Sequence, residues 1–311
     1  KNGEALFYKN VRDNTNVREL NVERIIKNNS NTPGYIANVY IREKSKSGLL
    51  LYDNLEQSSV RKTNNEDFTN TLDNVLQMFR DDKVQDKWNG LNSFTYTFKG
   101  DFKTFKDYIL RYSDLHYNNE CINYEHLDND YNLDPNLPLQ IVNNVITTNY
   151  KELLQEYYKE TISKNVWPLG DKQSNRFKSH NEPMSRFLHY ELLPLVEKIV
   201  NKRLRPTYTY LSAYVKDADL PAHTDRPDCE YTVSFIVDKP ENSSWNIYVH
   251  KVKQPIKHKG RYDFTPQLDE CEAVDCDAGG LMLFQGTDHI HFREKLPYDY
   301  YNILLLHYCS L

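Results

Sequence analysis

Short segments rich in β-branched and aromatic residues follow one another in the last third of the chain. Pro, Gly, Asp or Asn residues separate them, and no helical spacing of apolar residues lies between them. Turn residues between short strands are typical of antiparallel architectures, so the sequence predicts an antiparallel sandwich or barrel. The segments are PTYTYLSAYV (206–215), EYTVSFIVD (230–238), WNIYVHKVK (245–253), GLMLFQG (280–286), HIHFREKL (289–296) and YNILLLHYC (301–309).

The chain before residue 205 has a different pattern, with apolar residues at helical spacing in three windows, 65–82, 146–162 and 183–204. Pro194 is expected to kink the last of these helices. Residues 93–105 indicate a strand and a turn instead. We therefore expect an α+β fold, in which the helices pack on one outer face of the sheet. The predicted division is a mainly helical region with substrate-binding elements over residues 1–204 and a catalytic β core over 205–311, forming one compact unit.

Charge and cysteine content narrow the class of protein. The formal net charge of -5 over 311 residues gives no general attraction to nucleic acid or to an anionic membrane. No run of residues is apolar and long enough to cross a bilayer, and the charged start is unlike a signal peptide, although a leader could have been removed. Five cysteines without a CxxC pair favour free thiols in a reducing compartment. A cytoplasmic protein is expected, and its oligomeric state is left open.

Two polar clusters in the β-rich part can supply metal ligands. His223 and Asp225 stand two residues apart beside a predicted strand, so both side chains can point to the same side. Such a pair alone is a weak signal, because it also occurs in surface turns. A later strand, however, alternates His289, His291 and Arg293, and one imidazole from it completes a set of two histidines and one carboxylate.

That ligand set favours iron(II). Three protein ligands on one face of a metal leave neighbouring positions open, which suits a non-haem iron that binds a co-substrate and dioxygen. Structural zinc sites are usually closed by four protein ligands, and suitably placed cysteines are lacking. A catalytic zinc hydrolase with the same two histidines and one aspartate, and a cupin-like metal-binding protein that is not an oxygenase, remain as alternatives.

The order of these motifs resembles the iron(II)- and 2-oxoglutarate-dependent dioxygenases. YLSAYVKDADLPAHTD (210–225) is similar to the strand that precedes the HxD turn of that family, and YTVSFIVD (231–238) to the core strand that follows it. AGGLMLFQGTDHIHFRE (278–294) is similar to the glycine turn, strand and distal histidine, and YNILLLHY (301–308) to the closing strand. The resemblance covers about residues 205–311.

The resemblance implies a double-stranded β-helix, or jelly-roll, core and an enzyme that uses Fe(II), 2-oxoglutarate and O2. The metal ligands and catalytic residues would be His223, Asp225 and His291. The reaction implied is oxidation of an aliphatic C–H bond by hydroxylation, or by desaturation or oxidative cyclisation. Because Asp225 is present, hydroxylation is favoured over halogenation. His289 is two residues before His291 on the predicted strand, so both side chains point to the same face, and His289 is the alternative distal ligand. If it is not a ligand, it would line the substrate site.

The chain departs from the commonest family pattern in its co-substrate residue. An Arg or Lys often follows the distal histidine by about ten residues, where this chain has Tyr300 to Asn302. Arg293 is the best substitute, because a planar guanidinium can bind a carboxylate in bidentate fashion. Arg226 and Lys216 are lesser candidates, and Tyr214 can add a phenolic hydrogen bond to the co-substrate.

The sequence defines the substrate only as a class. The polar stretch 166–187 contains Arg176 and Arg186, which could bind the carboxylate of an amino acid or small acid, and Arg226 is a further candidate. We expect a small amino-acid-like metabolite, in a biosynthetic reaction of the natural-product type. A residue within a peptide or protein is the alternative substrate, and neither nucleic acid nor a membrane is expected as a partner.

Overall fold

A computed structural model describes the protein over residues 102–129, 131, 139–171, 173–254 and 260–311 and over short pieces at 6–7, 23–24, 76–77, 80, 87–88 and 96–97. The chain divides into two compact units, Lys1–Asn54 and Leu55–Leu311. In the first unit, strands β1 (Leu6–Phe7) and β2 (Glu23–Arg24) pair antiparallel. The sheets, the helices and the cavity described below all belong to the second unit.

The largest element of the second unit is a six-stranded antiparallel sheet in the order β5-β12-β9-β14-β7-β6. Its long central strands pair over most of their length, β14 with β7 on one side and with β9 on the other. Alternating β-branched and aromatic residues in these segments explain why they form strands. The strands are β5 (Leu139–Val142), β6 (Arg176–His180), β7 (Leu204–Val215), β9 (Tyr231–Asp238), β12 (Leu281–Phe284) and β14 (Tyr300–Ser310).

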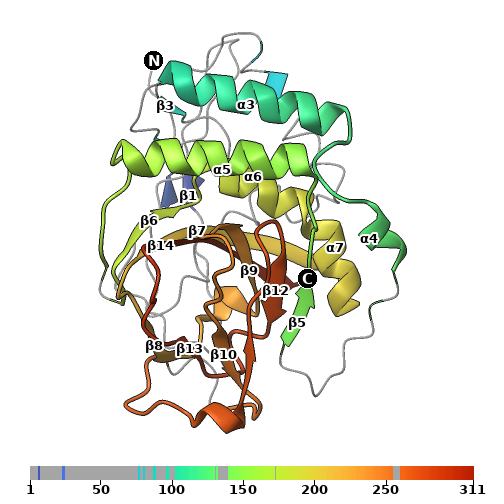
Figure 1. Cartoon of the computed structure of the whole chain (residues 1–311). Helices are drawn as coiled ribbons and strands as arrows, with labels where there is room; N and C mark the ends of the chain where they lie inside the picture. The colour runs from blue at the N-terminus through green and yellow to red at the C-terminus, as the bar shows by residue number, and fades with distance from the viewer. Residues whose placement is uncertain are drawn as a thin grey trace. The chain divides into compact units, whose positions relative to one another are not determined.

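A smaller sheet lies on one side of the large one, in the order β11-β10-β13-β8 (Figure 1). Its pairs are also antiparallel. The two sheets pack face to face as a jelly roll, so the fold class is α+β, as predicted. The strands are β8 (Leu220–His223), β10 (Ile247–His250), β11 (Cys271–Val274) and β13 (His291–Arg293).

Helices cover the other face of the large sheet: in Figure 1, α5 and α6 lie next to the sheet and α3 lies beyond α5. The helices are α3 (Phe102–Tyr117), α5 (Thr148–Ser163), α6 (Pro183–Glu191) and α7 (Leu193–Val200), and a short α4 (Glu125–Asp128) contacts α7. The window 183–204 thus forms two helices that meet at Leu192, with Pro194 in the first turn of the second. The helix is thus interrupted just before this proline, since a proline is tolerated in the first turn of a helix and not further inside it.

Strand alternation divides the apolar residues between two cores. On β9, Val233 and Phe235 pack with the helices, whereas Ile236 belongs to the cluster between the sheets. On β14, Leu304 packs with the helices and Ile303 faces the smaller sheet. Because successive side chains of a strand point to opposite faces, one sheet serves both a dry helix-facing core and an inner space.

The other sequence predictions have mixed outcomes. Window 146–162 is helical as predicted, whereas most of window 65–82 lies outside the described residues. In 93–105, Tyr96–Thr97 is a strand that pairs with Lys87–Trp88 (β4 and β3), but α3 begins at Phe102. The five cysteines are free and buried, and in the described part of the chain no helix is long and apolar enough to span a membrane. The boundary at residue 204 stays a prediction.

The alternation on β14 predicts that alanine substitutions of two neighbouring leucines lower the free energy of unfolding by unequal amounts. Leu304→Ala removes a fully buried side chain from the helix-facing core and should lower the free energy of unfolding by about 2–5 kcal/mol. Leu305→Ala, at a half-buried position that faces the inner cavity, should cost clearly less. Urea denaturation followed by tryptophan fluorescence measures both. Equal losses in the two variants would contradict the alternation.

Candidate functional site

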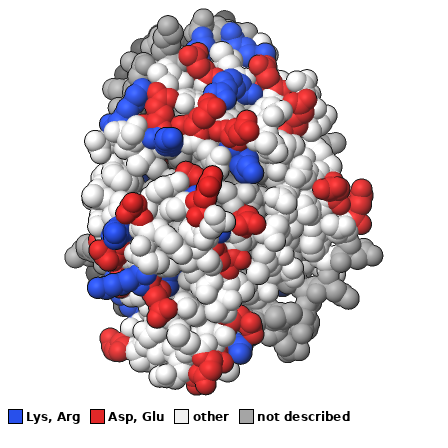
Figure 2. All heavy atoms as spheres, in the orientation of Figure 1, with Lys and Arg blue, Asp and Glu red and all other residues white. Residues whose placement is uncertain are grey.

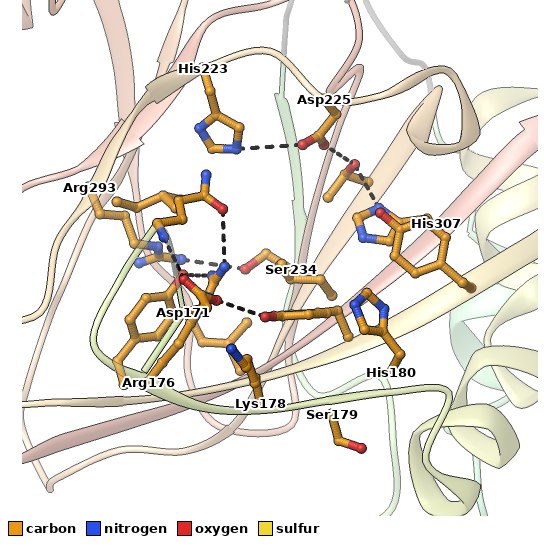
Figure 3. Close-up of a pocket in the computed structure, with 18 of the residues that line it drawn as sticks. Asp171, Arg176, Lys178, Ser179, His180, His223, Asp225, Ser234, Arg293 and His307 are labelled. Carbon is orange, nitrogen blue, oxygen red and sulfur yellow. Dashed lines mark hydrogen bonds and ion pairs between the residues drawn. The ribbon is translucent and has the colours of Figure 1, made fainter. Parts of the chain in front are cut away.

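A cavity of about 750 Å³ lies between the two sheets. The large sheet contributes wall residues from β6, β7, β9, β12 and β14, and the small sheet from β8, β10 and β13. The apolar part of the wall includes Leu220, Ile247, Phe284 and Ile303. Figure 3 shows the polar part, in which His223 and Asp225, at and just after the end of β8, approach the same space as Arg293 of β13 and His307 of β14. An apolar cavity with a few convergent polar groups is the usual form of a ligand site.

Two histidines and one aspartate meet at one point of this wall. The Nε2 atoms of His223 and His291 each lie 3.6 Å from Oδ1 of Asp225. The three residues offer ligand atoms that all lie within 4.8 Å of one another. The fold brings them together because β13 pairs with β8, which sets His291 directly opposite His223. Asp225 follows β8 by two residues and so returns to the same side.

Backbone carbonyls determine which nitrogen each imidazole presents. Nδ1 of His223 is 2.8 Å from the carbonyl oxygen of Pro221, and Nδ1 of His291 is 3.0 Å from that of His289. A carbonyl can only accept, so both Nδ1 atoms carry a hydrogen and donate it. The lone pair of each neutral ring is then on Nε2, which faces Asp225. Metal-binding histidines are usually oriented in this way.

The electrostatics favour a neutral His223 beside an ionised Asp225. Burial, and then the neighbouring His291, lower the pKa of His223. Burial alone would raise the pKa of Asp225, but the adjacent His291 and His223 hold it well below its usual range. A neutral imidazole and an ionised carboxylate are the forms in which these side chains bind a metal ion.

Thr232 and His307 hold the second oxygen of the carboxylate. The Thr232 hydroxyl donates to Oδ2 of Asp225 at 2.7 Å and accepts from Nδ1 of His307 at 3.1 Å. Gly286 leaves the room for this carboxylate, because a Cβ at that position would come within 2.1 Å of Oδ2. One oxygen of Asp225 is therefore anchored to the sheet and the other faces the two imidazoles.

The three side chains fit a divalent metal ion. Ligand atoms that each lie about 2.1 Å from a metal are separated by roughly 3 to 3.5 Å, close to the two Nε2 to Oδ1 distances here. Two imidazoles and one carboxylate on one side of an ion form the facial set of non-haem iron(II). The arrangement is of the HxD…H type that the sequence predicted.

Arg293 is the second chemical feature of the cavity. Its side chain is 3% exposed, and burial lowers the pKa of the guanidinium. It donates to the carbonyl oxygen of Trp245 and, at 3.4 Å, to the hydroxyl of Ser234 on the opposite sheet, and it lies over the Trp245 ring. No carboxylate of the described residues comes within ion-pair distance of it. A buried cation without a counter-ion is costly, so the site is suited to binding an anion.

Arg176 lines the cavity with its charge already paired. Its Nε lies 2.9 Å from Oδ2 of Asp171, and its other nitrogens donate to Gln173, Ser212 and the Tyr214 hydroxyl. Opposing the effect of burial, Arg176 and other hydrogen-bond donors lower the pKa of Asp171 to about 2. Tyr214 also lines the cavity, but its hydroxyl oxygen accepts a hydrogen bond from Arg176. The stretch around Arg176 forms an edge strand, β6, where the sequence suggested only a polar loop.

The remaining candidates lie in different places. Arg226 is exposed and lines the cavity. Arg186 is outside the cavity wall, buried in α6 against Tyr190 and His189. His289 is also outside, with its Nδ1 donating to the carbonyl oxygen of His250. Lys216 pairs with Asp299 on the surface. The fold thus brings together His223, Asp225, His291, Arg293, Tyr214, Arg176 and Arg226, and leaves out Arg186, His289 and Lys216.

Polar cavity residues that the sequence did not indicate include Thr232, Ser234 and His307. Each lies on a strand that the sequence did predict, at a position whose side chain points toward the cavity. The signal was the interruption of apolar alternation in TVSFIVD and ILLLHY, where an inward position carries a hydroxyl or an imidazole. Nothing in the sequence near His307 indicates that it lies beside Thr232.

Comparison with known proteins gives similarity in fold. No family model and no curated protein matches the sequence. Similar solved structures include a prolyl-4-hydroxylase of Pseudomonas putida, with 9% identity over 56% of this chain and 93% of that chain and a TM-score of 0.41. The non-haem α-ketoglutarate-dependent carbocyclase SnoK of nogalamycin biosynthesis has 13% identity over 56% and 79% of the chains, with a TM-score of 0.44.

A third similar structure is HygX of Streptomyces hygroscopicus with nickel, 2-oxoglutarate and hygromycin B bound. It has 14% identity over 61% of this chain and 88% of that chain, with a TM-score of 0.39. All three are distant likenesses that concern the fold. The function proposed below rests on the residues of the cavity.

The geometry predicts which histidine is the distal ligand. We expect each of three substitutions to weaken binding of Fe(II) or Co(II) by more than about 100-fold: His223→Ala, Asp225→Ala and His291→Ala. This loss exceeds the one expected from removing a residue that only hydrogen-bonds to a metal ligand. His289→Ala is the matched control, because only its backbone oxygen contacts His291. Anaerobic titration calorimetry measures the affinities, with circular dichroism to verify folding. A larger loss in His289→Ala than in His291→Ala would reassign the ligand.

Proposed function

We propose that the chain is an iron(II)- and 2-oxoglutarate-dependent oxygenase that oxidises an aliphatic C–H bond of a small, amino-acid-like metabolite. One observation carries the proposal: a facial set of two histidines and one aspartate shares a cavity with a buried arginine that has no carboxylate partner among the described residues. Either feature alone is compatible with several kinds of protein. Together they match a metal that needs a chelating co-substrate and a dicarboxylate that needs a cation at its far end.

His223, Asp225 and His291 would hold the iron. When bound, iron supplies the redox chemistry that couples oxidative decarboxylation of 2-oxoglutarate, with release of succinate and carbon dioxide, to oxidation of the substrate by O2. The carbonyl oxygens of Pro221 and His289 keep the two imidazoles in the ligating tautomer. Thr232 holds the far oxygen of Asp225 and so keeps this carboxylate directed through Oδ1.

Arg293 would bind the far carboxylate of 2-oxoglutarate. Its guanidinium lies against Ser234, whose hydroxyl can donate a further hydrogen bond to the same anion. Trp245 and Tyr301 lie beside the guanidinium and exclude water from it. In such surroundings a charge-assisted hydrogen bond is strong, because water does not compete for it. The carboxylate would also supply the counter-ion that Arg293 lacks.

The apolar wall supports C–H chemistry. Leu220, Ile247, Phe284 and Ile303 line the cavity, and Phe284 lies 4.8 Å from the His291 ring, measured between ring centroids. These side chains limit water near the metal ligands, which protects a reactive centre from side reactions. Hydroxylation is the expected outcome. Desaturation and oxidative cyclisation would use the same ligands.

A zinc hydrolase would use the same three ligands. It would leave the buried Arg293 without a role, so the oxygenase is the better-supported function. The two differ in a direct test. Anaerobic addition of Fe(II) and 2-oxoglutarate to the protein should give a weak visible charge-transfer band, and air should then produce succinate even without a substrate. Asp225→Ala should give neither signal. Absence of both signals in folded, iron-loaded wild-type protein would exclude the oxygenase.

The role of Arg293 predicts a selective defect. Arg293→Met should raise the Michaelis constant for 2-oxoglutarate by at least about 30-fold, the equivalent of about 2 kcal/mol for a buried charged partner, while iron affinity changes little. Lys216→Met serves as the control, because Lys216 pairs with Asp299 away from the cavity. Succinate formation at varied 2-oxoglutarate gives the constants. An unchanged Michaelis constant in Arg293→Met would move the carboxylate site elsewhere.

A further inference from the structure

The charges that line the cavity do not cancel. The basic side chains are those of Arg176, Lys178, Arg226 and Arg293, and the carboxylates are those of Asp171 and Asp225. Asp171 pairs with Arg176, and Asp225 belongs to the metal ligands. Under the proposed function, Arg293 is taken by 2-oxoglutarate. Lys178 and Arg226 then have no assigned counter-ion.

Neither of these two side chains has a carboxylate partner in the described part of the chain. Nζ of Lys178 donates to the carbonyl oxygen of Gly170 at 2.6 Å, which leaves two of its hydrogens for a ligand. Arg226 donates through NH2 to the Tyr208 hydroxyl at 3.2 Å and lies over the Tyr208 ring. Lys178 is on β6 of the large sheet, whereas Arg226 follows β8 of the small one, so they approach the cavity from opposite sheets.

The position of His180 indicates that the two cations act on the same space. Figure 3 shows Lys178 and His180 directed from β6 into the cavity and Ser179 directed away, as strand alternation requires. Burial lowers the pKa of His180, and then the positive charges of Arg226, Arg176 and Lys178 lower it further. His180 is exposed, as is Arg226, so this end of the cavity is its mouth. A neutral His180 adds no charge there.

Aromatic rings line the same end. The ring of His180 lies 4.5 Å from that of Tyr210 and 5.7 Å from that of Tyr208, and the Tyr208 ring lies 4.5 Å from that of His307. His307 is joined to Asp225 through Thr232. A path of aromatic surface therefore leads from the two cations to the metal ligands.

We propose that Lys178 and Arg226 bind an anionic group of the substrate, a carboxylate or a phosphate, while the rest of the substrate lies along Tyr208 and His180 toward His223 and Asp225. This inference rests on the proposed function and specifies its substrate class. It replaces Arg176 and Arg186 as the expected anion-binding residues, since the first is paired with Asp171 and the second lies outside the cavity. Neutral molecules of the same shape should bind at least tenfold more weakly.

The test uses three probes of similar shape: 3-phenylpropionate, phenyl phosphate and the neutral 3-phenylpropionamide. The full chain is loaded with Mn(II) and saturating 2-oxoglutarate without oxygen, and binding is followed by paramagnetic relaxation of the probes' ring protons. An anionic probe should bind at least tenfold more tightly than the amide, and the better anion identifies the group. Lys178→Met and Arg226→Met should each remove most of this preference, whereas Lys216→Met should keep it.

The outcomes separate the two proposals. If Mn(II) and 2-oxoglutarate bind but the amide binds as well as both anions, or no probe binds, the anion site is wrong and the oxygenase stands. An anion preference that survives in both variants, or that disappears as 2-oxoglutarate is raised, also overturns the anion site, because the probe then occupies Arg293. If Mn(II) and 2-oxoglutarate do not bind to folded protein, the proposed function fails, and the inference that rests on it fails with it.

Discussion

The pairing of β13 with β8 is the contact on which the site depends. It sets His291 opposite His223 although the two are far apart in sequence, and it places Asp225 just beyond the end of the pair. The register shifts between His291 and Arg293, as in a β-bulge, and both side chains still line the cavity. A slip of one residue in this pairing would turn the distal histidine out of the cavity. The metal ligands and the buried cation therefore depend on the same few backbone hydrogen bonds.

The large sheet makes a cavity with buried polar and charged groups compatible with a stable fold. Its outer face is dry and covered by helices, so the helix-facing core does not depend on what the inner face carries. The inner face can then place Thr232, Ser234 and His307 among apolar neighbours, each with a hydrogen-bond partner. Charge on the visible surface is mixed, with acidic and basic side chains interspersed among the described residues (Figure 2). In the cavity wall, by contrast, Lys178, Arg226 and Arg293 have no carboxylate partner among the described residues.

The features of the fold and the site that could be predicted from the sequence are those that depend on short-range pattern. The i, i+2 spacing of His223 and Asp225, the alternation around His291 and the long strands of the large sheet are all local properties, and the structure has each of them. Contacts that depend on which strands become neighbours could not be predicted from the sequence. That Arg176 is neutralised by Asp171 depends on the fold of the turn before β6. That Arg186 is buried between α6 and the large sheet, outside the cavity, depends on how α6 packs on β7 and β14.

The two groups of cations differ in depth, and this difference constrains the order of binding under the proposed function. Arg293 is fully enclosed between the sheets, whereas Arg226 is exposed at the mouth and Lys178 is half-buried beside it. A ligand held at Lys178 and Arg226 would stand between solvent and the inner end of the cavity. A dicarboxylate that neutralised Arg293 would therefore have to enter first, and the substrate would close the cavity behind it. An enclosed cation for the co-substrate and exposed cations for the substrate would thus enforce an ordered reaction without any moving part.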